Sequence, residues 1–197
     1  MFQGEIKKRL DLLENDLVLT SDSQLHLQEK SEQGIADLTL HLQNPCILFK
    51  DLEHKKLEYF QNKKCADYVL YEQKDGNWMV HIFELKRTIG EKHWLNMKEQ
   101  FKGAMQNALA IAGFLGIEVD MENIHIYSVY RNDKLKDYSN PAKLRFQMHQ
   151  PKCGGMPEEC KDWNEKEVVL DFLDKEKFVH HKIPLDLEDG TGAYTMI

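Results

Sequence analysis

Two acidic residues and one lysine have the types and spacing that could carry chemistry in this sequence. Asp67 lies near the start of a run rich in aromatic and β-branched residues, and Glu84-Leu85-Lys86 closes the next such run. Two carboxylates supply the oxygen ligands that Mg²⁺ or Mn²⁺ prefers. Such a cation can stabilise charge on a phosphate and lower the pKa of a water molecule, and a nearby lysine can orient that water.

A predicted hairpin would bring these three side chains together. Lys74-Asp75-Gly76-Asn77 separates strand-like segments at 65–72 and 77–86, and Asp-Gly favours a two-residue turn because both residues tolerate positive φ. If Lys74 faces Asn77, the same register puts Asp67 opposite Glu84, and directly opposed Cβ atoms lie about 5 Å apart. Lys86 points to the same face because side chains alternate along a strand.

The elements around the hairpin indicate an α/β fold. A short strand candidate at 57–60 precedes it, and a long helix with a wide apolar face spans 91–115 and ends before Gly116. An alternating run at 123–130 predicts a further strand. The order strand, strand, strand, helix, strand is typical of an antiparallel unit joined to another strand through a helical crossover.

The flanking segments carry weaker patterns. An amphipathic helix is expected at 4–16 and a second short helix at 31–42, which Asn44-Pro45 would end because proline disfavours a helical residue before it. Strands are expected at 168–173 and 178–183, followed by a frayed tail.

The order Asp67, then Glu84-Leu85-Lys86 after a hairpin, then a long helix resembles the PD-(D/E)XK nuclease superfamily. The resemblance covers roughly residues 57–130. It implies a restriction-endonuclease-like αβββαβ core, in which helices flank a mixed central sheet, and metal-dependent hydrolysis of phosphodiester bonds in DNA or RNA. It also implies that Asp67 and Glu84 bind Mg²⁺ or Mn²⁺ and that Lys86 assists the attacking water.

The match to this superfamily is not complete. Ala66 stands where the namesake proline would be. Some members carry a further acidic residue on the first helix, for which Glu5 and Glu14 are the candidates here. One subgroup has a tyrosine four residues after a glutamine in the following helix, whereas here Ala104 follows Gln100.

Basic residues near the predicted site could contact nucleic acid, although a solvated surface is the alternative interpretation. They are Lys63, Lys64, Arg87, Lys98 and Lys102. A net charge of −7 argues against a protein that coats nucleic acid by bulk attraction, but phosphate contacts do not require an overall basic chain.

Simpler interpretations of these motifs stay open. Glu-X-Lys occurs five times in the sequence, and only the occurrence at Glu84 ends a long apolar strand. A charge cluster at a sheet edge can also serve to discourage aggregation. The alternative function is an inactive nuclease-like module that binds nucleic acid or a protein partner. Cys153 and Cys160 lack the usual spacing of a zinc site.

We expect one domain over residues 1–197: an N-terminal helical part (1–56), a nuclease-like core (57–131) and an acidic C-terminal extension (132–197). No apolar run reaches the ~20 residues that cross a bilayer, so no membrane association is expected. Four cysteines in a chain of this length favour the reducing cytoplasm over a disulfide framework. A homodimer would suit cleavage of both strands of a duplex.

Overall fold

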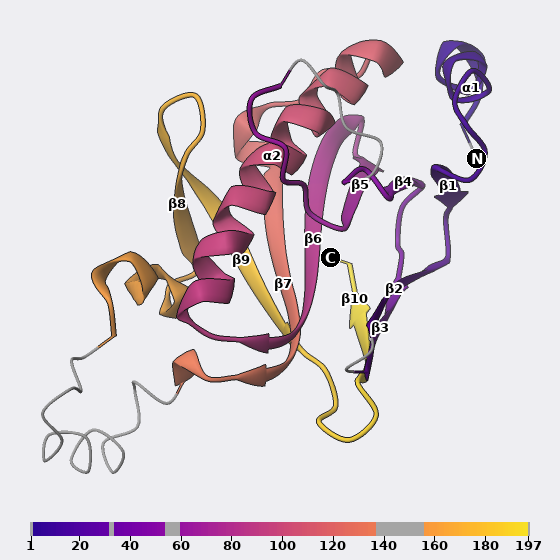
Figure 1. Ribbon diagram of the computed structural model, residues 1–197. Coiled ribbons are helices and arrows are strands. Elements are labelled where there is room, and N and C mark those ends of the chain that lie inside the picture. The colour runs from indigo at the N-terminus through magenta and orange to yellow at the C-terminus, as the bar shows by residue number, and fades with distance from the viewer. Residues whose placement is uncertain (1, 32–33, 54–59, 137–155, 197) are drawn as a thin grey trace, which may run out of the picture.

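The computed structural model describes residues 2–31, 34–53, 60–136 and 156–196 (Figure 1). Its helical elements are α1 (Gly4–Leu10), α2 (Glu91–Leu115) and the 3₁₀ helices η1 (Met121–Asn123) and η3 (Glu158–Asn164). Its strands are β1 (Val18–Ser21), β2 (Gln24–Ser31), β3 (Gly34–His41), β4 (Cys46–Lys50), β5 (Tyr68–Lys74), β6 (Asn77–Ile89), β7 (Ile124–Asp133), β8 (Glu167–Asp171), β9 (Lys175–Pro184) and β10 (Thr191–Thr195).

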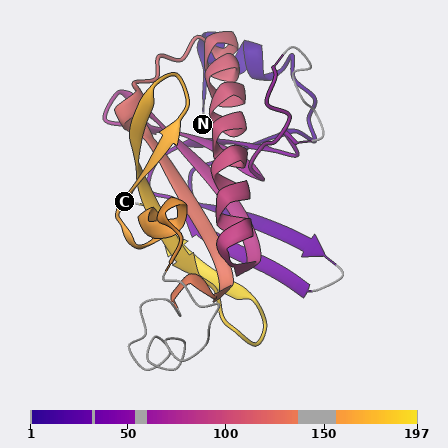
Figure 2. The same ribbon diagram turned by 60° about the vertical axis from the view of Figure 1, so that its left-hand side comes forward.

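These elements form an α/β fold of three layers. A mixed seven-stranded sheet in the order β1-β4-β5-β6-β7-β9-β8 lies in the middle. Helix α2 runs across one face of this sheet, over β6 and β7 (Figures 1 and 2). A three-stranded sheet in the order β10-β3-β2 packs its apolar side chains on the other face.

The centre of the large sheet has a simple connection pattern. Strands β4, β5 and β6 pair antiparallel in succession, and β7 then pairs parallel with β6. Parallel neighbours need a long crossover, which α2 supplies. Strand β9 pairs parallel with β7, and β8 closes this side of the sheet as the antiparallel neighbour of β9.

The turn between β5 and β6 has the conformation that its sequence predicts. Asp75 and Gly76 have φ angles of 51° and 84°, and Lys74 pairs with Asn77. The register continues through Tyr68 and Phe83, which form the last pair of this ladder. Asp67 and Glu84 therefore occupy the next position beyond the paired strands.

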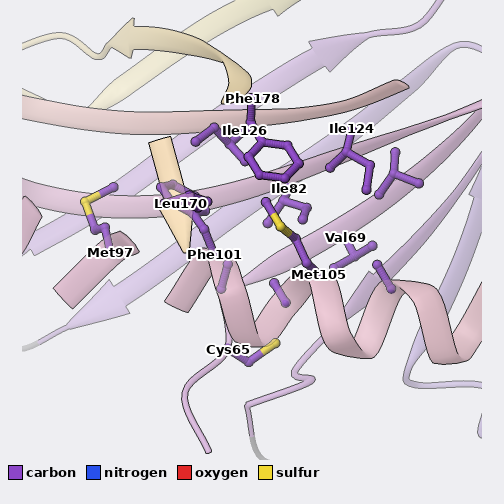
Figure 3. Packing of buried hydrophobic residues seen from close by; sticks show 14 of the residues in the cluster. Cys65, Val69, Ile82, Met97, Phe101, Met105, Ile124, Ile126, Leu170 and Phe178 are labelled. Carbon is purple, nitrogen blue, oxygen red and sulfur yellow. The ribbon is translucent and has the colours of Figure 1, made fainter. Parts of the chain in front are cut away.

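One hydrophobic core lies between α2 and the large sheet. Figure 3 shows the side chain of Met105 of the helix directed toward Ile82 of the sheet, and Met97 and Phe101 of the helix belong to the same buried cluster. Residues of the central strands are also covered on their opposite face by the small sheet. Strand β6 is thus buried without interruption from Val80 to Leu85, although this stretch contains Glu84.

Gly103 allows α2 to approach the segment that leads to Asp67. A Cβ atom at Gly103 would lie only 1.7 Å from the carbonyl oxygen of Lys64. Only glycine fits between the helix and this backbone. The helix ends before Gly116, whose φ of 70° is the left-handed conformation typical of a helix C-cap.

The N-terminal part differs from its prediction. The expected helix at 31–42 is wrong, because Ala36, Leu38 and Leu40 alternate into the core along β3. The expected N-terminal helix ends at Leu10 instead of continuing to residue 16. Described residues up to 53 contain one short helix and four strands, so this part is not mainly helical.

Other boundaries in the chain are also revised. The strand that precedes the hairpin is β4, whereas the expected strand at 57–60 lies almost entirely outside the described residues. The expected frayed tail instead contains β10, which pairs parallel with β3. The helix at 91–115 is confirmed to the residue, and the strands expected near 123–130, 168–173 and 178–183 are present as β7, β8 and β9.

Among the described helices, none is both long and apolar enough to cross a membrane.

Candidate active site

Two hydrogen bonds hold the carboxylates of Asp67 and Glu84 at the end of the β5–β6 hairpin. The backbone N–H of Asp67 donates to Oε2 of Glu84 at 3.2 Å. The backbone N–H of Leu85 donates to Oδ2 of Asp67 at 2.7 Å. Each carboxylate is therefore held by the backbone of the opposite strand, and the two acidic side chains lie side by side as the hairpin register predicts.

Lys86 completes the predicted cluster. Its ammonium forms an ion pair with Oε1 of Glu84. Glu84 is 0% exposed, while the side chain of Lys86 is 21% exposed. Oε1 of Glu84 makes no hydrogen bond, so the ion pair is its only described polar contact. The structure thus brings together all three residues that the sequence singles out for catalysis.

The surroundings of the carboxylates disfavour a second negative charge. Burial raises the pKa of Asp67 to about 6, against the opposing effects of Lys86 and of the Leu85 N–H. Burial and the charge of Asp67 raise the pKa of Glu84 to about 8, although Lys86 acts in the other direction. Burial lowers the pKa of Lys86, but the two carboxylates outweigh it and the net shift is upward. Lys86 therefore stays charged at neutral pH.

Glu29 is a further acidic residue near this cluster that sequence reasoning missed. It follows the buried Leu25 and Leu27 on the inward face of β2, and its pKa is raised by burial while Lys86 lowers it. Tyr68 fixes this part of β2 beside β5, because its hydroxyl accepts from the Gln28 N–H at 2.9 Å and donates to the Gln28 carbonyl at 2.8 Å. The alternation of Leu25, Leu27 and Glu29 is the sequence pattern that could have placed Glu29 on the inward face of a strand.

Helix α2 holds the segment that leads into Asp67. The side chain of Asn62 donates to the carbonyl of Glu99 at 2.9 Å and accepts from the Lys64 N–H at 3.0 Å. Buried Gln100 approaches the Cys65 carbonyl at 3.4 Å. These contacts, with the close approach at Gly103, set the position of residues 62–66 and so the entry of the chain into Asp67.

Asp67 and Glu84 are the residues that could hold a divalent cation. Their donor set consists of carboxylate oxygens, which suits Mg²⁺ or Mn²⁺, and Glu84 offers a buried oxygen without a hydrogen bond. Within the described residues no group of three or more His, Cys, Asp or Glu side chains is arranged to hold a metal. Water or substrate oxygens would have to complete the coordination, as is usual for Mg²⁺.

Three of the predicted nucleic-acid contacts line one groove. Lys64, Lys98 and Lys102 lie along a groove of about 500 Å³ between α2 and β8, together with Lys92. The Lys63 and Arg87 side chains do not line it, and both are exposed. The structure therefore separates the five predicted residues into a groove set and two residues outside it.

Three of the groove lysines already have partners. Lys98 forms an ion pair with Asp162 at 2.5 Å. Lys102 pairs with Glu99 at 2.6 Å, and Lys64 donates to Asn96 at 2.7 Å. An anionic polymer would have to compete with these contacts, so the groove is less positive than its lysine content suggests.

The candidates Glu5 and Glu14 are not brought to the site. Helix α1 docks at the C-terminal end of α2, where Arg9 donates to the Phe114 carbonyl at 2.9 Å. Gln100, which contacts the site segment, lies about 21 Å from Phe114 along the helix axis at 1.5 Å per residue. Cys160 is buried, and Cys153 lies outside the described residues.

No family model matches this chain, and neither the curated proteins nor the solved structures give a match. The geometry of the site is therefore the basis for assigning a function to this protein.

Proposed function

We propose that this protein is a metal-dependent nuclease that hydrolyses phosphodiester bonds of DNA or RNA. The observation that carries the proposal is the pair of hydrogen bonds that holds Asp67 and Glu84 side by side, with Lys86 in contact with Glu84. An unbroken buried strand is an unfavourable place for charged groups unless they are paired or bind a ligand.

The order of the elements supports the same proposal. A helix comes first, β4, β5 and β6 pair antiparallel in succession, and α2 leads to the parallel strand β7. This order agrees with the αβββαβ core of the PD-(D/E)XK superfamily, apart from the hairpin β2–β3 and strand β1, which precede β4. The two acids and the lysine occupy the central hairpin of this arrangement.

The side chains have distinct roles in the proposed reaction. Asp67 and Glu84 hold the cation, which when bound supplies positive charge to the phosphate and lowers the pKa of the attacking water. Lys86 is charged at neutral pH and is therefore a poor general base. Its ammonium is suited to orienting the water and stabilising the negative charge that develops on the phosphate.

The lysine groove supports a polyanionic substrate. Lys64 is three residues from Asp67, so their Cα atoms are at most about 11 Å apart along an extended chain. Lys98 and Lys102 continue the groove along α2. Phosphates next to the scissile bond could follow this groove while the bond itself lies at the carboxylates.

A cleavage assay tests the proposal. Tag-free protein would be incubated with single- and double-stranded DNA and RNA in Mg²⁺, Mn²⁺ or EDTA. Glu84→Gln and Lys86→Gln should each reduce metal-dependent cleavage by about 100-fold or more, with their folds verified by circular dichroism. Lys134→Gln is the matched control, because Lys134 is exposed and outside the site. Equal cleavage by all four proteins would assign the activity to a contaminant and contradict the proposal.

Binding without turnover is the second candidate function. The observation that favours it is the contact between Glu84 and Lys86, which neutralises both groups without a metal. Under this alternative, nucleic acid binds with the same affinity in EDTA and in Mg²⁺, and no cleavage is seen with either ion.

A further inference from the structure

Three histidines lie on adjacent strands on the face of the large sheet opposite α2. His81 of β6 is the register partner of His125 of β7, and His181 of β9 is the register partner of Tyr127. His81 and Glu84 are an odd number of residues apart on one strand, so they point to opposite faces. The histidine cluster is therefore separate from the proposed hydrolytic site.

His81 is fully occupied by its neighbours. Its Nε2 lies 3.0 Å from Oε2 of the buried Glu72, and its Nδ1 lies 3.0 Å from the hydroxyl of Tyr127. A carboxylate only accepts, so Nε2 donates to Glu72, and in the neutral ring Nδ1 accepts from Tyr127. Asn44 also donates to Glu72, at 2.7 Å. His81 is thus a support for the cluster and has no nitrogen left for a ligand.

His125 and His181 differ from His81, because their nitrogens face each other. Nδ1 of His125 lies 3.2 Å from Nε2 of His181, and both side chains are half-buried. A single proton can lie between two imidazole nitrogens at this distance. The ring of His181 also stacks on Tyr127 with centroids 4.4 Å apart, which limits the movement of the pair.

We propose that His125 and His181 bind a divalent transition metal of the Zn²⁺ class in place of the proton that they share. Zn–N bonds of about 2.0–2.1 Å at a tetrahedral angle separate two ligand nitrogens by about 3.3–3.4 Å. The observed 3.2 Å is close to this value. Two further positions would be left to water or an external ligand, because no third His, Cys, Asp or Glu side chain among the described residues joins this pair.

The protonation state of the pair suits this ligand. Burial and the neighbouring His81 and His181 lower the pKa of His125 to about 4. Burial and His81 also lower the pKa of His181. Both rings are therefore neutral at pH 7, which is the state that coordinates metals. Imidazole nitrogen prefers Zn²⁺, Cu²⁺ and Ni²⁺ to Mg²⁺, so this site and the carboxylate site would select different ions.

A Zn²⁺ titration tests the proposal on the full, tag-free chain with a chromophoric chelator as competitor. The chain would carry Asp67→Asn and Glu84→Gln, so that binding at the carboxylates does not contribute. His125→Asn and His181→Asn should each weaken Zn²⁺ binding by at least 10-fold. His93→Asn should leave it unchanged, because His93 is exposed on α2.

A second measurement needs no histidine substitution. Addition of Co²⁺ should produce the visible absorption bands of tetrahedral Co²⁺. Addition of Zn²⁺ should shift the imidazole ¹⁵N signals of His125 and His181. Absence of Zn²⁺ binding, equal binding by all three histidine variants, or unshifted signals from these two rings would overturn the proposal. Failure of the nuclease assay would not affect this result, since the carboxylate site is already disabled.

Discussion

Asp67 and Glu84 exchange backbone contacts across the end of a hairpin, so that each carboxylate accepts an N–H from the strand of the other. The two acids are thereby fixed beside each other where water is largely excluded from Glu84. Like charges in such a place repel and raise each other's pKa. The arrangement costs stability unless a proton, Lys86 or a bound cation offsets the charge.

Replacing Glu84 by glutamine should stabilise the metal-free protein at high pH. Folded Glu84, with a pKa of about 8 against its ordinary value of 4.5, binds its proton more tightly than the unfolded chain does. Stability therefore falls as pH rises between these two values, by up to about 1.4 kcal/mol per pH unit. Urea unfolding at pH 6 and pH 9 should show this loss in the wild type and a smaller loss in Glu84→Gln.

Glu72→Gln is the matched control for that measurement. Glu72 is also wholly buried, but its pKa is lowered, because hydrogen bonds from His81 and Asn44 outweigh the effect of burial. Its charge is stabilising, and Glu72→Gln should lower the free energy of unfolding at pH 7. If both substitutions destabilise the protein equally at pH 9, the account of Glu84 is wrong.

Gly103→Ala should disturb the site through the backbone. The new Cβ would meet the carbonyl of Lys64, and either α2 or the segment leading to Asp67 must move. We expect a loss of about 2 kcal/mol or more in the free energy of unfolding. Gly113→Ala on the same helix is the control. Apart from its chain neighbours and the nearby backbone of its own helix, no atom lies within 4 Å of the added Cβ, so this substitution should be neutral or stabilising by up to about 1 kcal/mol. Equal effects of the two substitutions in thermal unfolding would contradict the prediction.

His180→Phe should reduce the acid sensitivity of the fold. His180 is buried against Trp94, with its Nε2 2.9 Å from the Ser128 hydroxyl, and burial lowers its pKa to about 3. The unfolded chain binds this proton more tightly, so stability is lost as pH falls from 6.5 toward 3, by up to about 1.4 kcal/mol per unit. Denaturant unfolding at pH 7 and pH 4.5 should show a smaller loss for His180→Phe than for the wild type, and identical losses would rule out this role.

The double substitution Lys64→Gln/Lys102→Gln should weaken nucleic-acid binding and reduce its salt dependence. Each phosphate contact adds about 0.9 to the slope of log K against log salt for duplex DNA. We therefore expect a slope smaller by about 2, measured by fluorescence anisotropy between 50 and 200 mM NaCl. A double variant with the wild-type slope would place the substrate elsewhere, and Lys134→Gln serves as the control with an unchanged slope.

The sequence predicted the parts of the site that depend on local signals. Asp75-Gly76 determines the turn, the turn determines the register, and the register brings Asp67 to Glu84. Helix 91–115 was predicted to the residue because its apolar face is long and Gly116 ends it.

Long-range pairings account for most of what was missed. Ala36 and Leu40 are four residues apart and fit a helix as well as a strand, and the choice is made by packing against the large sheet. Strand β10 pairs with β3, although most of the chain separates the two strands in the sequence. No local pattern indicates this pairing. Glu29 is near Lys86 only because β2 and β6, which are far apart in the sequence, come together in the fold.

Locating Mn²⁺ in crystals of the protein tests the central claim most directly. Anomalous difference density from crystals grown with MnCl₂ should show an ion bonded to the carboxylates of Asp67 and Glu84, and Glu84→Gln should abolish it. Density that lies elsewhere, or its absence at saturating Mn²⁺ with Lys86 still paired to Glu84, would contradict the proposed hydrolytic site.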